Sequence, residues 1–445
     1  MIKRLPLLFR HVTYNLRGGF LVRPLTITLV LGFAGAFLSE AEEMFPNLSE
    51  WVPRTLFPSH ADPQVAQVIL AAIAGSIMTV VSIVFAILLM TLTLASMQFS
   101  PRILAGFVRD RLTQWTLGVF LGTFSYCMAA LPAARSVPHP FSPVVTVMGA
   151  MMLAFACVCL LLFFIHHISQ AISVNQIVDR VASETEAVID DLMPEPQRYP
   201  RMGSVYSADL SSWKPAVINQ TAGYIRYIDQ GRLVNLTKTY HVQVHCPRRV
   251  GHFVPAGIPI LLASKPERIT EQAGKEFLAA FDIGPTRTLQ QDVEFGVLQI
   301  VDIALRAISP AVNDPTSAIS CVDQLSRILI RFVSRRPAEQ FLFDPPGVLR
   351  VSIPWIGFQG LIKSAFEQIR LYAKGDVAVS LRLLRAFGDV ASATEDPDHR
   401  LALLAMGKDV VTGCAEKLTG LELRDVQIRE KTLESLCCNA LQGTD

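Results

Sequence analysis

The chain has 445 residues, of which 51% are apolar and only 18% are charged, and its mean hydropathy is +0.38. Soluble globular domains usually carry about 25% charged residues, so this composition excludes a wholly soluble protein. The net charge of only +2, without a basic tract interleaved with aromatic residues, gives no support for nucleic acid as a partner.

A basic N-terminal segment covers residues 1–24, and a membrane domain is predicted to follow over residues 25–170. A bilayer crossing takes about 20 apolar residues, and the first apolar run reaches that length only with its flanks. None of the apolar runs contains Asp, Glu, Lys or Arg. They cover about 25–39, 66–97, 115–134 and 143–166. We therefore expect an α-helical integral membrane protein with about four transmembrane helices.

Basic residues flank these runs unevenly. Lysines and arginines precede the first run at positions 3, 4, 10, 17 and 23, and arginines follow the second run at positions 102, 109 and 111. The loop between these two runs is dominated by Asp and Glu instead. Because cytoplasmic loops of membrane proteins are enriched in Lys and Arg, both termini are predicted to be cytoplasmic.

Small and hydroxylated residues recur along the second run at alternating steps of four and three. At 3.6 residues per turn these positions share one helix face. One interpretation is a packing seam, where small side chains let helices approach and hydroxyls bond across the contact. The other is a pore lining that faces water in a homo-oligomer. This stripe consists of Gly75, Thr79, Ser82, Ala86, Leu89, Thr93 and Ser96.

Residues 171–213 are predicted to form an amphipathic helix and a proline-rich linker, and residues 214–266 a small β module. Short β-rich runs are separated in this module by turns, with glycines at Gly251 and Gly257 where φ > 0 is needed. The G-x-x-V-x-x-G spacing of this turn resembles the second half of the barrel-sandwich, biotinyl/lipoyl-like module, which implies a barrel-like fold. No lysine stands at a hairpin tip, and we expect no cofactor.

A helical cytoplasmic domain is predicted over residues 267–445, with its first two helices joined at the turn SPAVNDP. Asp314 followed by Pro315 is typical of a helix start, and Asp302 and Arg306 are spaced as an i,i+4 ion pair. Capping and packing explain much of this pattern. A polar ligand or ion site is the alternative, because buried polar groups need partners. The candidate residues for such a site are Asp292, Asp302, Arg306, Asn313 and Asp314.

The stretch RTLQQDVEFGVLQIVDIALRAISPAVNDPTSA, residues 287–318, resembles the signature of the domain of unknown function 2254 family of bacterial membrane proteins. The likeness extends to TLTLASMQFSPRIL, FVRDR and GYIRYID, and so to nearly the whole chain. The resemblance implies a multi-pass protein of the bacterial inner membrane with a soluble C-terminal domain. It also directs attention to the region from Asp302 to Asp314 as a functional centre.

Function is constrained mainly by what the sequence lacks. It contains no Ser–His–Asp pattern, P-loop or GxGxxG, so we predict no enzyme, no catalytic residue and no metal site. The favoured interpretation is an oligomeric channel or gated pore with a cytoplasmic sensor or vestibule domain. The alternative is a membrane-anchored scaffold or regulator without conduction, and a membrane-bound enzyme is least favoured. The expected partners are the lipid bilayer, further copies of the chain and an ion or small charged ligand.

Overall fold

The computed structural model describes residues 21–45, 62–98, 111–136, 140–171, 173–193, 212–344 and 347–439. The chain divides into two compact units, residues 1–173 and residues 174–445.

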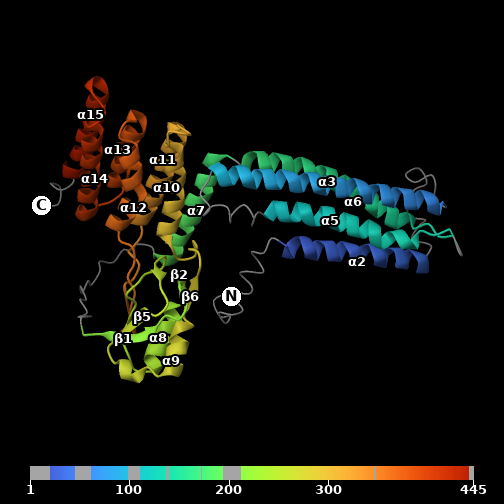
Figure 1. The fold of residues 1–445 in the computed structure, drawn as a ribbon, viewed down its shortest axis with the longest axis horizontal. Coiled ribbons are helices and arrows are strands. Elements are labelled where there is room, and N and C mark those ends of the chain that lie inside the picture. Colours follow the sequence, from blue (N-terminus) through green and yellow to red (C-terminus); the bar gives the residue numbers. More distant parts are fainter. Residues whose placement is uncertain are drawn as a thin grey trace. The chain divides into compact units, whose positions relative to one another are not determined.

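The described part of the first unit contains four helices that are long and apolar enough to cross a membrane (Figure 1). They are α2 (Val22–Met44), α3 (Pro63–Gln98), α5 (Arg111–Ala130) and α6 (Val144–Ala171). The expectation of about four membrane helices is thus confirmed. Apolar stretches of this length fold as helices because a helix satisfies its own backbone hydrogen bonds.

Helices α2 and α5 approach each other closely through glycines. A Cβ atom placed on Gly35 of α2 would lie 2.5 Å from the carbonyl oxygen of Tyr126 on α5. A Cβ atom placed on Gly122 of α5 would lie 2.5 Å from the side chain of Leu31 on α2. Small residues at such contacts let two backbones pack within van der Waals distance, which is the main source of helix association in lipid.

The second unit begins with α7 (Val174–Leu192), which lies in the range where an amphipathic helix is expected. Its buried face packs against α10 (Val293–Ala307) and α11 (Pro315–Val333). On its polar side, Arg327 of α11 donates to Glu186 and Asp179 of α7, and Arg331 donates to both carboxylate oxygens of Asp190 at 2.8 and 2.6 Å. The amphipathic pattern thus serves packing within this unit.

Two open sheets follow in the second unit. One has the strand order β1-β5-β3-β8-β7 and the other β4-β2-β6. The strands are β1 (Lys214–Ile218), β2 (Gly223–Ile228), β3 (Val244–His245), β4 (Phe253–Val254), β5 (Pro259–Ala263), β6 (Phe281–Gly284), β7 (Phe341–Asp344) and β8 (Val348–Ser352).

The expectation of a barrel-like module is wrong, since neither sheet closes on itself within the described residues. The reason lies beyond residue 266. Strand β6 pairs with β2, and β8 pairs in parallel with β3, so later parts of the chain occupy the edges that a barrel would have to join. Two short helices accompany the sheets, α8 (Gln230–Thr239) and α9 (Glu271–Leu278). Asp229 caps α8 by accepting the Arg232 amide at 3.0 Å.

Helices form the rest of the second unit (Figure 1). After α10 and α11 come α12 (Phe358–Tyr372), α13 (Val377–Ser392), α14 (Pro397–Ala415) and α15 (Gly420–Asn439). Aspartate side chains cap α10, α11, α13 and α14, whereas α12 begins at Gly357 without a side-chain cap. The caps explain why these helices start where they do.

Candidate functional site

The structure separates the residues that the sequence grouped into one candidate site. Asp292 precedes α10, and Asp314 follows it as the first capping residue of α11. The 15 residues of α10 lie between them, which corresponds to about 22 Å at 1.5 Å per residue. Asp302 and Arg306 lie within α10, and Asn313 lies in the turn before α11. Asp292 therefore belongs to a different neighbourhood from Asn313 and Asp314.

The turn at Asp314 is a well-formed helix start. Its carboxylate accepts the Ser317 amide at 3.1 Å and the Ser317 hydroxyl at 2.5 Å. These hydrogen bonds, the hydroxyl first, hold the pKa of Asp314 below its ordinary value. Asn313 has a φ of +50°, a conformation that Asn adopts more readily than most residues. Its backbone N–H donates to the Ser309 carbonyl. Capping accounts for each of these contacts.

Replacement of Asp314 distinguishes a cap from a charge-dependent site. Asp314→Ala should destabilise the protein by about 0.5–2 kcal/mol, and Asp314→Asn or Asp314→Ser should restore most of this, because both still accept a first-turn amide. Thermal unfolding of the purified full chain measures the difference. If Asp314→Asn is as damaging as alanine, the negative charge itself is required and capping is not the whole role.

Asp292 lies in a buried network of charges. Arg287 binds it with two hydrogen bonds, Nε to Oδ2 at 2.8 Å and Nη2 to Oδ1 at 2.9 Å, and the Asp292 side chain is only 2% exposed. Asp292 also caps α10 by accepting the Phe295 amide at 3.1 Å. The Arg287 guanidinium lies over the Phe295 ring, 5.5 Å from its centroid. Both carboxylate oxygens of Asp292 are therefore occupied.

Glu294 extends this network to two other elements. Its Oε2 accepts from Arg287 and from Arg249, each at 3.0 Å, and its Oε1 accepts from the Ser364 hydroxyl of α12 at 2.8 Å. Burial alone would raise the pKa of Glu294, but Arg249, Ser364 and Arg287 together hold that pKa below its ordinary value. The carboxylate is thus ionised and joins α10 to α12 and to the loop that carries Arg249.

Gly251 makes room for this network. Its φ is +88°, in the left-handed region that favours glycine, which confirms the predicted turn glycine. A Cβ atom there would overlap the Asp292 carboxylate and lie 2.7 Å from Nη2 of Arg287. The backbone of this loop can therefore approach the buried ion pair only because residue 251 has no side chain.

Four members of this network are not among the residues predicted from the sequence: Arg249, Arg287, Glu294 and Ser364. Arg287 and Glu294 lie beside Asp292 in the chain, so their charge pattern was a usable signal. Arg249 and Ser364 are 45 and 70 residues away from Glu294 and reach it only through the tertiary fold.

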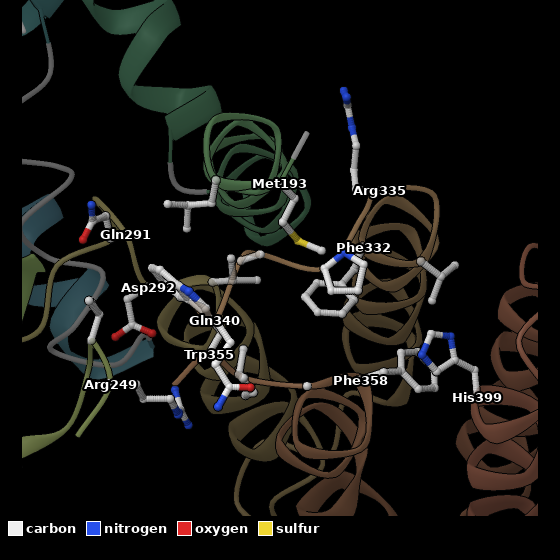
Figure 2. Close-up of a pocket in the computed structure, with 18 of the residues that line it drawn as sticks. Met193, Arg249, Gln291, Asp292, Phe332, Arg335, Gln340, Trp355, Phe358 and His399 are labelled. Atoms are coloured by element: carbon white, nitrogen blue, oxygen red, sulfur yellow. The ribbon is translucent and has the colours of Figure 1, made fainter. Parts of the chain in front are cut away.

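A cavity of about 500 Å³ adjoins this network within the second unit. Its wall includes the end of α7, the end of α11 and the segment after it, the segment that leads into α12, and the start of α14. Figure 2 shows Arg249, Asp292 and Trp355 on one side of the open space and Phe358 and His399 on another. Arg335 extends away from this space in Figure 2, and its Nη2 binds Asp190 at 2.9 Å.

The stripe on α3 lies on the exposed side of the first unit. Gly75, Thr79, Ser82, Ala86, Leu89 and Thr93 are all exposed, and Ser96 falls among the residues whose side chains lie outside the description. The hydroxyls of Thr79, Ser82 and Thr93 donate to the carbonyls four residues earlier. The opposite face is the one that packs, through Ala66, Leu70, Ala74, Ile77, Val81 and Val84. The stripe is thus not a packing seam among the described helices of this unit.

Comparison with known proteins gives a family and two relatives. A family model described as "Predicted membrane protein (DUF2254)" matches residues 17–389. The Uncharacterized protein Rv1290c of Mycobacterium tuberculosis and the Uncharacterized protein Mb1321c of Mycobacterium bovis are each 31% identical over 347 residues. The match covers 77% of this chain and 66% of each relative, so the chain spans just under two thirds of their length. No solved structure matches the chain. The match to the family model extends over most of the sequence, and the chain belongs to the predicted membrane protein family DUF2254.

Proposed function

We propose that this protein is an oligomeric membrane channel whose path is lined by the stripe on α3. The exposed position of the stripe is the observation that carries this proposal. Exposed faces of the other membrane helices carry large apolar side chains, as lipid contact requires: Leu25, Leu29, Phe33 and Phe37 on α2, and Met152, Phe155, Leu162 and Phe163 on α6. On α3 such side chains flank the stripe, at Met78, Ile83, Phe85 and Met90. Apart from Leu89, the stripe consists of glycine, alanine, serine and threonine, which suit water or another helix better than lipid.

The chemistry of the stripe supports a passive path. Each hydroxyl donates its hydrogen within the helix, and its oxygen keeps acceptor capacity for water or a partly hydrated cation. The central parts of the spans contain no Asp, Glu, Lys or Arg, and coupled carriers usually place such a residue within the membrane. Glu42 is buried near the end of α2, where its carboxylate accepts the Val145 and Thr146 amides at the start of α6. The proposed channel therefore conducts down a gradient instead of coupling transport to a second ion.

The proposed topology places both termini and the whole second unit in the cytoplasm of a bacterium, with the helices in the inner membrane. Its support is the excess of Lys and Arg before the first span and after the second, opposed by the acidic loop between them. In this arrangement the second unit serves as the sensor or vestibule of the channel.

Thiol labelling in proteoliposomes tests the channel. In a background without the eight native cysteines, Ser82→Cys and Thr93→Cys should react with a water-soluble methanethiosulfonate reagent, and the reaction should reduce ion flux. Phe155→Cys on the exposed face of α6 is the matched control and should stay inert, because lipid shields it. Inert Ser82→Cys and Thr93→Cys would overturn the pore lining. Disulfide cross-links between copies at Ser82→Cys without flux would favour a membrane-anchored regulator or scaffold instead.

A further inference from the structure

The cavity beside the charged network has the lining of a small-molecule site. We propose that it binds a small organic anion with a planar apolar body, whose head group is held by Arg249 and by the first-turn amides of α12. This site goes beyond the proposed channel and depends only on the second unit.

The walls of the cavity suit a planar apolar body. Its volume of about 500 Å³ lies in the range of small-molecule sites, which is about 300–1,000 Å³. Phe332, Trp355 and Phe358 line it (Figure 2). The Trp355 indole N–H donates to the Glu339 carbonyl at 3.1 Å, and the Phe358 ring packs on the His399 ring with centroids 4.2 Å apart. Two of the three rings are thus fixed by contacts within the protein.

The polar lining offers donors and has few acceptors to spare. Asp292 is saturated by Arg287 and by its capping bond. Asp396 caps the start of α14, where its Oδ1 accepts the Asp398 backbone amide. Arg249 donates a hydrogen bond of 3.0 Å to an oxygen of Glu294 that also accepts from Arg287. A guanidinium has five N–H donors, so Arg249 retains donors for a ligand, although its charge is balanced within a network of two arginines and two carboxylates. The spare donors favour an anionic head group.

The start of α12 adds further donors at the same cavity. Gly357 and Phe358 line the space, and Gly357 has no side chain to cap the helix. Within the described part of the chain, the amides of the first three residues of α12 receive no side-chain cap, unlike those of α10, α11, α13 and α14. A Cβ atom on Gly357 would meet nothing within 4 Å, so there is room where a capping oxygen would lie. Uncapped amides at a helix start bind anionic oxygens.

Binding of 1-naphthyl phosphate to the detergent-solubilised full chain tests the site, with inorganic phosphate as the head-group-only probe. Equilibrium dialysis against protein-free micelles corrects for partitioning into detergent. We expect naphthyl phosphate to bind at least tenfold more tightly than phosphate, and Trp355→Ala to reduce that difference. No measurable binding of naphthyl phosphate by the wild-type protein would overturn the proposal. Equal affinity for the two probes would show that the planar apolar body contributes nothing to binding and would contradict that part of the proposal.

The decisive variant is Gly357→Asp. Gly357 has a φ of −84° and a ψ of 169°, which any capping residue can adopt, so the new carboxylate should cap α12 itself. We expect an unchanged or higher melting temperature together with at least a tenfold loss of affinity for naphthyl phosphate. Gly357→Ala, which adds a Cβ atom without charge, should keep the affinity, and Arg249→Gln should lower it. Wild-type affinity in Gly357→Asp would refute the site. Because no step measures ion flux, the result is independent of conduction.

Discussion

Asp292→Asn should destabilise the second unit by about 3–5 kcal/mol, far more than the same exchange at Asp314. Both residues cap helices, but only Asp292 is a buried partner of an arginine. Loss of its charge leaves Arg287 and Arg249 to share the single carboxylate of Glu294. Asp314→Asn keeps an amide acceptor at a more exposed turn and should stay within about 1 kcal/mol of the wild type. Urea unfolding of the full chain, followed by tryptophan fluorescence, measures both variants.

A double variant separates the ion pair from the cap. Arg287→Met combined with Asp292→Asn should recover part of the lost stability, because the excess positive charge is then absent and Glu294 keeps Arg249 as its partner. If Asp292→Asn costs no more than Asp314→Asn, Arg287 does not depend on the Asp292 charge, and the network is not what holds α10 in place.

Gly35→Val should destabilise the membrane unit, whereas Gly75→Val should leave the protomer folded. At Gly35 the added side chain meets the backbone oxygen of Tyr126, which cannot turn aside, so α2 and α5 must separate. Overpacking of this kind costs about 1–3 kcal/mol or more, and a backbone obstacle places the effect at the upper end. Gly75 meets no atom within 4 Å in its own unit. Thermal unfolding and protease resistance in detergent measure the difference between the two variants.

The same pair of variants bears on assembly. If copies associate through α3, Gly75→Val should lower the oligomeric mass measured by light scattering, while the protomer keeps the thermal stability of the wild type. An equal loss of stability in both glycine variants would contradict the observed packing of α2 on α5.

Features governed by local sequence were predictable. The spans follow from uninterrupted apolar length, and the starts of α8 and α11 follow from an acidic residue that can accept a first-turn amide. The left-handed conformation of Gly251 follows from a turn that only glycine adopts without strain. Each of these rests on residues within one or two helical turns of one another.

Features governed by distant contacts were not predictable. The expected barrel failed because strands beyond residue 266 complete both sheets, and periodicity does not encode strand partners. The Asp292 to Asp314 region looked like one cluster because charges close in sequence were read as close in space, although α10 holds them apart. The stripe on α3 was correctly placed on one face, but the neighbours that decide which face packs lie on α5 and α6.

The parallel pairing of β3 with β8 has a consequence for synthesis. Val244 pairs with Val351, so the partner of β3 leaves the ribosome roughly 100 residues later. At bacterial elongation rates this delay lasts about 5–20 s. During that interval β3 presents an unpaired edge in the nascent chain, and such edges promote aggregation. The shortness of β3, which spans only Val244–His245, limits the edge that nascent chains expose to one another before the sheet is complete.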